Sequence, residues 1–150
     1  MSTLITSAIT STPTQTPMIT VLMSCYNAAK WLDKAISSVL IQTYTNFEFI
    51  IVNDGSLDNT LDIIQNFAAF DARIIVVSKP NSGLSDSLNV GINMARGEWI
   101  ARLDADDICE PIRLQRQIEL ALTNSNLVFI GSGLTIIDDL GRKKTTYSYP

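Results

Sequence analysis

The sequence predicts a doubly wound α/β fold, in which a mostly parallel sheet is flanked by helices. Two observations lead to this fold class. Short apolar runs of strand length alternate, along most of the chain, with segments that carry apolar residues at helical spacing. The strand-length runs are continuously apolar, which is typical of parallel strands buried on both faces of a sheet.

The expected strands are the apolar runs at 19–23, 47–52, 74–78 and 99–103, with 127–138 as a fifth strand or two short ones. A helix is expected in each segment that follows one of the first four strands, because one face of each such segment is apolar. These faces contain Leu32, Ala35, Ile36, Val39 and Leu40, then Leu61, Ile64 and Ala68, then Leu84, Leu88, Gly91, Ile92 and Ala95, and finally Leu114, Ile118, Ala121 and Leu122.

Local signals mark several boundaries of these elements. Asp58 is a predicted cap of the second helix, and Pro111 is expected in the first turn of the fourth. Residues 139–144, with sequence DLGRKK, are expected to turn the last strand back.

Length and composition indicate one globular domain. The chain has 150 residues, of which 46% are hydrophobic and 17% charged. Residues 1–17 are rich in Ser and Thr and are predicted to be a disordered tail, so the domain is expected to span 18–150. The tail has neither the basic start nor the long apolar run of a secretory signal, and no stretch approaches the roughly 20 apolar residues of a membrane span.

The residues that are absent or scarce exclude several kinds of site. The sequence contains no histidine, which excludes Ser-His-Asp catalysis, Cys-His catalysis and histidine-ligated zinc. Any metal must therefore be held by carboxylate oxygens, which favours Mg²⁺ or Mn²⁺. Cys25 and Cys109 match no zinc or redox spacing and are expected to be reduced thiols. A net charge of −4 argues against nucleic acid as a partner.

An acidic segment follows the strand predicted at 99–103. Asp104, Asp106 and Asp107 would repel one another unless a cation lies among them. Residues i and i+2 of an extended segment point the same way, so Asp104 and Asp106 form a predicted pair of metal ligands. The alternative is a solvated acidic loop that caps the helix near Pro111, and this alternative explains Asp107 best.

The turns after the first two strands should lie at the same edge of the sheet as this acidic segment, because ligands of doubly wound folds bind at the carboxyl ends of the strands. Ser24 offers a hydrogen-bond donor there, and Tyr26 offers either a stacking surface or simple packing. Asp54 either accepts N–H groups from a nucleotide base or serves only the Asn-Asp-Gly turn.

These motifs occur together in an order and at a spacing that resemble one enzyme family. The stretches concerned read ITVLMSCYNAAKWLDKAISSVLIQTY, FEFIIVNDGSLDNT and NSGLSDSLNVGINMARGEWIARLDADDICEPIRLQRQ. They are similar to the donor-binding half of a family 2 glycosyltransferase of the Rossmann-like GT-A fold, from about Ile19 to about Gly133. Within that family the sequence resembles bacterial enzymes that build capsules, exopolysaccharides or lipopolysaccharide.

The resemblance implies a role for each matching position. The nucleotide-sugar-binding residues would be Ser24, Tyr26, Asp54, Asn81, Gly83, Asn89 and Asp104. Asp104 and Asp106 match the DXD motif, in which Asp106 would bind Mg²⁺ or Mn²⁺ directly and Asp104 would lie near the ribose or the metal. Many relatives carry a basic residue at the position of Leu88, and the nearest alternative cation in this sequence is Arg102.

A second departure is length. Family members continue for roughly another hundred residues, so the domain is expected to be incomplete, with the acceptor-binding half and the aspartate that acts as catalytic base beyond Pro150. The predicted function is metal-assisted, inverting transfer of a sugar from a nucleoside diphosphate sugar, a UDP-sugar by preference, to a saccharide or lipid-linked hydroxyl. Such an enzyme is expected in the cytoplasm, at the inner face of the membrane if its acceptor is lipid-linked.

Two other functions compete with this one. The first is a non-catalytic nucleotide-sugar-binding remnant or regulatory module of the same fold. The second is a phospho-acceptor signalling domain with an acidic metal pocket, which would need a lysine opposite the carboxylates, such as Lys79. The signalling hypothesis leaves the motifs at Ser24–Asn27 and Asn53–Ser56 unexplained.

Overall fold

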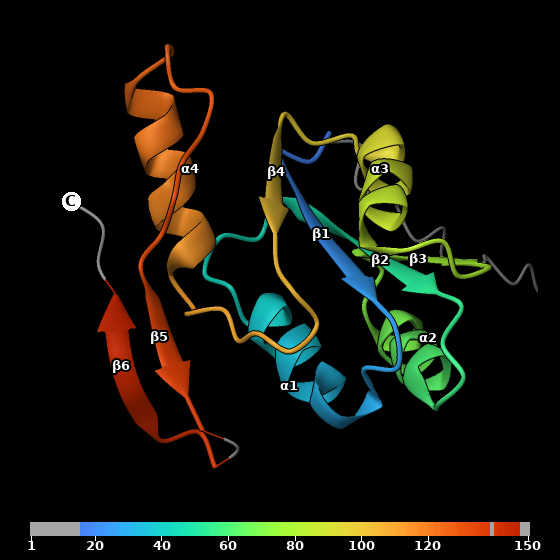
Figure 1. Cartoon of the computed structure of the whole chain (residues 1–150). Helices are drawn as coiled ribbons and strands as arrows, with labels where there is room; N and C mark the ends of the chain where they lie inside the picture. Colours follow the sequence, from blue (N-terminus) through green and yellow to red (C-terminus); the bar gives the residue numbers. More distant parts are fainter. Residues whose placement is uncertain (1–15, 139, 148–150) are drawn as a thin grey trace, which may run out of the picture.

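The computed structural model describes residues 16–138 and 140–147, which form a sheet with helices on both faces and a separate hairpin (Figure 1). The elements are β1 (Ile19–Cys25), α1 (Ala29–Leu40), β2 (Phe47–Asp54), α2 (Thr60–Phe70), β3 (Ile74–Lys79), α3 (Leu84–Met94), β4 (Trp99–Arg102), α4 (Arg113–Thr123), β5 (Leu134–Ile137) and β6 (Lys143–Tyr147). No helix of this part of the chain is long and apolar enough to cross a membrane.

The main sheet has four parallel strands in the order β3-β2-β1-β4. The chain first winds outward from β1 to β2 and β3, and then crosses back through α3 to place β4 on the other side of β1. This reversal beside β1 is the switch point at which doubly wound sheets bind their ligands. The predicted fold class is therefore confirmed.

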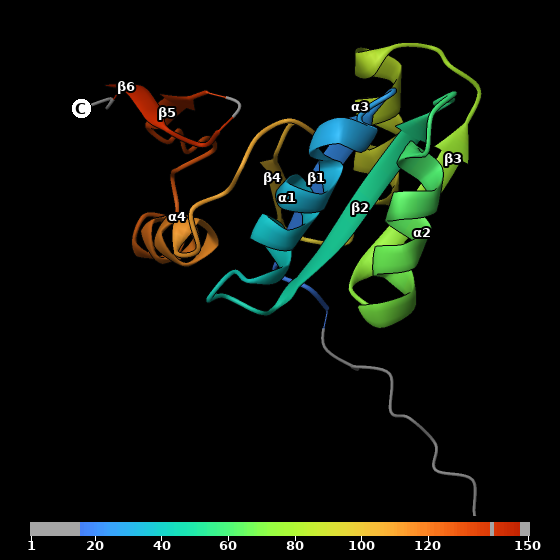
Figure 2. The same ribbon diagram turned by 90° about the horizontal axis from the view of Figure 1, so that it is seen from below.

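The two faces of the sheet carry different helices, as Figures 1 and 2 show. Val21, Met23, Phe49 and Ile51 belong to a buried cluster that includes residues of α1, α2 and α4. Leu22, Ile50 and Val52 form a second cluster, against which Leu88 and Ala95 pack from the segment of α3. The alternation of a strand explains this division, because successive side chains point to opposite faces. We call the second side the α3 face.

The close approach of α3 to β1 depends on a glycine. A Cβ atom at Gly91 would lie 2.2 Å from Cδ1 of Leu22, which is buried at the centre of the α3 face. Gly91 was predicted to belong to the apolar face of this helix, and the structure shows that its small size is what allows the packing.

A buried carboxylate fixes the crossover from α3 to β4. The Glu48 side chain is only 3% exposed and accepts hydrogen bonds from Thr20 Oγ1 at 2.8 Å and from the Arg96 backbone N–H at 2.7 Å. The Arg96 guanidinium binds the same carboxylate, with Nη2 2.6 Å from Oε2. Thr20 in turn accepts the Gly97 N–H at 3.0 Å. These contacts hold the chain just before β4 against β1 and β2.

The observed elements differ from the predicted ones mainly after α4. Within the predicted strand 127–138 only Leu134–Ile137 is a strand, and it pairs with β6 and not with the main sheet. Residues 127–133 have no ladder partner, and glycines at 131 and 133 interrupt the apolar run. The predicted turn at 139–144 is confirmed by the antiparallel hairpin, although residue 139 lies outside the described ranges.

Smaller differences concern the ends of elements. β1 and β2 continue two residues beyond the predicted ends, to Cys25 and Asp54. The cap residue of α2 is Asn59 and not the predicted Asp58, which lies one residue earlier and accepts the Thr60 N–H at 3.0 Å. Helix α4 begins at Arg113, two residues after Pro111. Most of the predicted tail 1–17 lies outside the described residues, so its disorder stays a prediction.

The Glu48 network leads to the first testable prediction. Arg96→Met should lower the free energy of unfolding by about 3 kcal/mol, because it leaves a buried carboxylate without its charged partner. Arg116→Met, at an exposed position of α4, is the matched control and should change stability by less than about 0.5 kcal/mol. Urea unfolding of both variants tests this, and equal stabilities would contradict the role given to the network.

Candidate functional site

Ser24, Asp54 and Arg102 lie at the carboxyl ends of neighbouring strands and on the same face of the sheet. In the register of the parallel strands, Ser24 pairs with Val52, and Arg102 pairs with Leu22. Val52 and Leu22 both belong to the α3 face, and side chains paired across parallel strands share a face. Asp54 shares this face because it lies two residues after Val52. The ends of β1, β2 and β4 therefore present polar groups toward one region.

The turns after β1 and β2 are tied to each other. The Asn27 backbone N–H donates to Ser56 Oγ at 3.0 Å, and Asn27 Oδ1 accepts the Leu57 N–H at 2.8 Å. Asn27 has φ 51, in the left-handed region that asparagine tolerates better than most residues. Gly55 has φ 70, and a Cβ atom there would lie 2.6 Å from the backbone nitrogen of Asn81. The Asn-Asp-Gly sequence at 53–55 thus allows the turn after β1, the turn after β2 and the segment at Asn81 to meet.

Asp54 organises the loop that leads into α3. Its carboxylate is buried and accepts hydrogen bonds from Lys79 Nζ at 2.5 Å and from the backbone N–H groups of Ser82 and Gly83, both at 2.9 Å. Burial alone would raise the pKa of Asp54, but these hydrogen bonds outweigh burial and lower the pKa to about 2. Asp54 is therefore ionised at neutral pH and holds the 79–83 loop in place.

Lys79 was not among the predicted site residues of the favoured function. Its ammonium group bridges Asp54 and Asp86, with Nζ 3.2 Å from Asp86 Oδ2, and it also contacts Ser82 Oγ. The hydrogen bond to Asp54 is the main cause of the raised pKa of Lys79. The sequence showed only that Asp54 and Lys79 lie at the ends of consecutive strands, and the structure shows that they are paired in register. The signalling-domain hypothesis required a lysine that faces the acidic segment. Lys79 binds Asp54 and Asp86 instead.

The remaining predicted nucleotide-binding residues differ in their surroundings. Asn81 donates from Nδ2 to the Asp54 carbonyl at 2.9 Å, and Gly83 immediately precedes α3. Asn89 is exposed on α3, and the Tyr26 side chain at the end of β1 is half-exposed. Leu88, at the position where relatives carry a cation, packs against the apolar cluster of the α3 face. The structure brings Asp54, Asn81 and Gly83 into direct contact, while Tyr26 and Asn89 present open surfaces.

The acidic segment forms a turn after β4, as predicted, but it does not have the extended course from which the pairing of Asp104 and Asp106 was argued. The Asp107 N–H donates to the Asp104 carbonyl at 3.1 Å, which bends the chain over Ala105 and Asp106. The pairing of Asp104 with Asp106 can therefore no longer be argued from strand alternation. Partial burial raises the pKa of Asp107, and the nearby carboxylates of Asp106 and Asp104 raise it further.

Asp104 and Asp106 have different neighbours. Asp104 Oδ1 lies 2.6 Å from Nη2 of Arg102. Asp106 is exposed and lines a hollow of about 210 Å³ together with Trp31 and Lys34 of α1. Ile108, Ile137, Asp138 and Gly141 complete this hollow, so the β5–β6 hairpin reaches the acidic turn.

The chain that follows the acidic turn is anchored on the end of α1. Gln42 donates from Nε2 to the Glu110 carbonyl at 2.8 Å and accepts the Leu114 N–H at 3.0 Å. Ser38 Oγ accepts the Cys109 N–H, also at 3.0 Å. Gln42 and Ser38 are buried polar residues that the sequence did not single out.

The acidic turn fits a divalent cation only in part. Its carboxylates are hard oxygen ligands of the kind that Mg²⁺ and Mn²⁺ prefer. Burial, and after it the nearby carboxylates of Asp106 and Asp104, raises the pKa of Asp107. No group of three or more acidic or cysteine side chains in the described ranges could hold a metal ion alone. An ion held by Asp104 and Asp106 would complete its coordination with water and with phosphate oxygens, as Mg²⁺ usually does.

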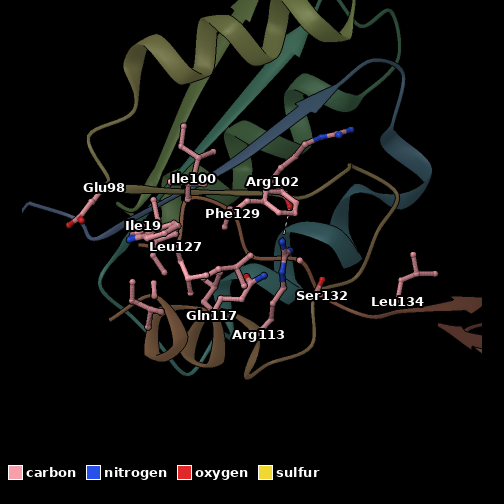
Figure 3. A pocket seen from close by; sticks show the side chains of 18 residues that line it. Ile19, Glu98, Ile100, Arg102, Arg113, Gln117, Leu127, Phe129, Ser132 and Leu134 are labelled. Atoms are coloured by element: carbon pink, nitrogen blue, oxygen red, sulfur yellow. Dashed lines mark hydrogen bonds between the residues drawn. The ribbon is translucent and has the colours of Figure 1, made fainter. Parts of the chain in front are cut away.

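A further cavity lies on the other side of β4 and reaches the candidate site only at Arg102. A groove of about 1050 Å³ runs between β4 and α4 and is lined mainly by apolar side chains, including Ile100, Leu127 and Phe129 (Figure 3). It follows the edge of β4 that has no neighbouring strand in the described part of the chain. The groove offers few polar groups, so it does not replace the strand ends as the candidate site.

The two cysteines do not contribute a nucleophile. Both are buried and free, as expected of reduced thiols. Burial, with the nearby carboxylates of Asp58 and Asp54, raises the pKa of Cys25 to about 12, and burial also raises the pKa of Cys109.

The Asp54 network leads to a prediction about pH. The pKa of Asp54 is about 2 in the folded chain against an ordinary value of 3.8, so its contribution to stability is complete above pH 3.8 and is lost as the pH falls toward 2. Asp54→Asn should therefore be less stable than the original chain near neutral pH, and the difference should shrink on acidification. Urea midpoints from about pH 6 down to about pH 2 test this. A difference that does not change with pH would contradict it.

Comparison with known proteins agrees with this geometry. Residues 20–149 match the family described as glycosyl transferase family 2. An uncharacterised glycosyltransferase of Haemophilus influenzae is 39% identical over 122 residues, which cover 81% of this chain and 38% of that protein. The putative glycosyltransferase EpsE of Bacillus subtilis is 36% identical over 83% of this chain and 46% of its own length. The chain thus spans less than half of these relatives.

Solved structures give the same assignment. S. aureus TarS 1–349 in complex with UDP-GlcNAc superposes with a TM-score of 0.68 at 25% identity, covering 71% of this chain and 32% of TarS 1–349. The mannosyltransferase PcManGT of Pyrobaculum calidifontis, in complex with GDP-Man and Mn²⁺, gives a TM-score of 0.58 at 26% identity, over 64% of this chain and 29% of that one. The predicted GT-A architecture is confirmed, and the chain belongs to glycosyl transferase family 2.

Proposed function

We propose that the carboxyl ends of β1, β2 and β4 bind a nucleoside diphosphate sugar, with UDP-sugars preferred. The observation that carries this proposal is the convergence of Ser24, Asp54 and the acidic turn beside the loop that leads into α3. Structural neighbours in complex with UDP, UDP-GlcNAc and GDP-Man support a donor of this class.

The proposed contacts with the base and ribose use the exposed surfaces and hydrogen-bonding groups of the residues at the strand ends. The half-exposed ring of Tyr26 would stack on the base, and the Ser24 hydroxyl would donate to the base or ribose. The Asp54 carboxylate already accepts hydrogen bonds from Lys79, Ser82 and Gly83, so its proposed contact with a base N–H must share an oxygen with them. Asn81, Gly83 and Asn89 would line the nucleotide on the side of α3.

Asp106 and Asp104 are the proposed ligands of Mg²⁺ or Mn²⁺. A neighbour in complex with Mn²⁺ supports a divalent ion in this fold. When bound, such an ion would neutralise the diphosphate and stabilise it as a leaving group. A cation here would also offset the repulsion among the carboxylates of the acidic turn, of which Asp104 already pairs with Arg102.

We assign donor binding to these residues and sugar transfer to an enzyme of the relatives' length, since the chain spans 38% and 46% of the two curated relatives described above. The acceptor is proposed to be a saccharide or lipid-linked hydroxyl in bacterial polysaccharide synthesis, and the transfer to be inverting. A chondroitin synthase of Pasteurella multocida is 32% identical over 76% of this chain, which supports a polysaccharide product. The alternative is a non-catalytic module that binds the same donor.

Titration calorimetry with UDP tests donor binding. The chain should bind UDP in the presence of Mn²⁺ and bind it much more weakly with EDTA. Asp106→Asn should lower UDP affinity in Mn²⁺ at least about tenfold, since a direct metal ligand is lost. Glu98→Gln, an exposed substitution just before β4, removes one negative charge at the amino end of the sheet and should leave affinity unchanged.

If the UDP affinity is the same with Mn²⁺, with EDTA and in Asp106→Asn, the proposed metal site is contradicted. Binding of UDP without hydrolysis or transfer of a UDP-sugar would favour the non-catalytic module. An absence of UDP and GDP binding by the folded chain would contradict the proposed function itself.

A further inference from the structure

Arg102 places a weakly held cation beside the acidic turn. It is the last residue of β4, and its guanidinium Nη2 lies 2.6 Å from Asp104 Oδ1. The two side chains are 52% and 48% exposed. An ion pair that is half in water contributes little to stability, so it is easily exchanged for other partners.

The position of Arg102 matches that of the proposed donor. Its register partner is Leu22, so its side chain emerges on the α3 face, which also carries Ser24 and Asp54. The acidic turn begins two residues later. The guanidinium therefore contacts the proposed metal ligand Asp104 and emerges on the face that carries Ser24 and Asp54.

Two other cations near the strand ends, Lys79 and Arg113, are held by protein partners, while Lys34 of α1 lies beside Asp106. Lys79 binds Asp54, Asp86 and the Pro80 carbonyl. Arg113 donates from Nη2 to the Arg102 carbonyl at 3.0 Å and lies 3.6 Å from Cys109 Sγ. In Figure 3 the guanidinium groups of Arg113 and Arg102 lie on opposite sides of β4. Arg113 thus fixes the backbone of Arg102 and leaves its side chain directed at the α3 face.

We propose that Arg102 binds the diphosphate of the donor, after its guanidinium exchanges Asp104 for a phosphate oxygen. This inference rests on the proposed function and adds a residue to it. A divalent ion on Asp104 competes with Arg102 for the same carboxylate and repels the guanidinium. The diphosphate offers it new anionic oxygens, which the planar guanidinium fork can bind through two hydrogen bonds.

The contact between Arg102 and the diphosphate matters because Leu88 is apolar and cannot supply a positive charge. Leu88 packs against Leu22, Ile50 and Val52, so α3 presents no cation at that point. Arg102 lies on the same face of the sheet and can supply the missing positive charge from β4.

Binding of Mn²⁺, uridine and UDP to Arg102→Gln tests the exchange, with Arg116→Gln as the matched control on the exposed side of α4. In Mn²⁺, the UDP affinity of Arg102→Gln should fall about tenfold, the typical effect of one charged hydrogen-bonding partner, while uridine affinity stays unchanged. Without nucleotide, Arg102→Gln should bind Mn²⁺ more tightly than the original chain, because Asp104 has lost its competitor. Arg102→Lys should retain part of the UDP affinity.

The possible results distinguish a failure of the Arg102 contact from a failure of the proposed donor binding. If the original chain binds UDP with Mn²⁺ and Arg102→Gln binds it equally well, Arg102 does not contact the diphosphate and the proposed function stands. Equal losses of uridine and UDP affinity would also overturn the phosphate contact. A loss confined to UDP without tighter Mn²⁺ binding would overturn the exchange at Asp104. If the original chain binds no UDP, the proposed function fails first.

Discussion

The placement of β4 beside β1 is the constraint on which the candidate site depends. The chain must cross the sheet from β3 to reach this position, and the crossover is fixed by the buried Glu48 carboxylate and by the close packing of α3 over Gly91. Once β4 is paired in register with β1, its last residues emerge next to Ser24. The strongest anchor thus lies at the amino end of the sheet, while the carboxyl end is left to polar residues and open turns.

At that carboxyl end, Asp54 and Asp104 show two different uses of a carboxylate. Asp54 is buried, accepts several hydrogen bonds and holds the 79–83 loop against β2, so it builds the wall of the proposed nucleotide site. Asp104 is half-exposed, and its ion pair with Arg102 is weakened by the surrounding water. A permanently satisfied carboxylate gives rigidity, and a loosely paired one can accept a metal. The different roles of Asp54 and Asp104 follow from their different burial, since both are aspartates.

The sequence predicted most of the main sheet, because each parallel strand is a continuous apolar run and the intervening helices have clear apolar faces. It also predicted which strand ends would meet, since Ser24, Asp54 and Asp104 follow strands in one parallel sheet. It could not predict that Lys79 binds Asp54 or that Arg102 binds Asp104, because side-chain direction depends on register and on the turn at 104–107. The expectation of one strand or two at 127–138 was wrong for residues 127–133, since a ladder needs a partner strand that an apolar run alone does not specify.

The most direct test of the account is a ¹⁵N–¹H NMR titration of the chain with UDP, repeated with a trace of Mn²⁺. We expect shift changes in Ser24–Asn27, in Asp54 and its turn, and in 81–89. We also expect paramagnetic broadening that is strongest at Asp104–Asp107 and depends on UDP. Shift changes confined to the groove between β4 and α4, or broadening centred on another acidic cluster, would contradict a donor site at the strand ends.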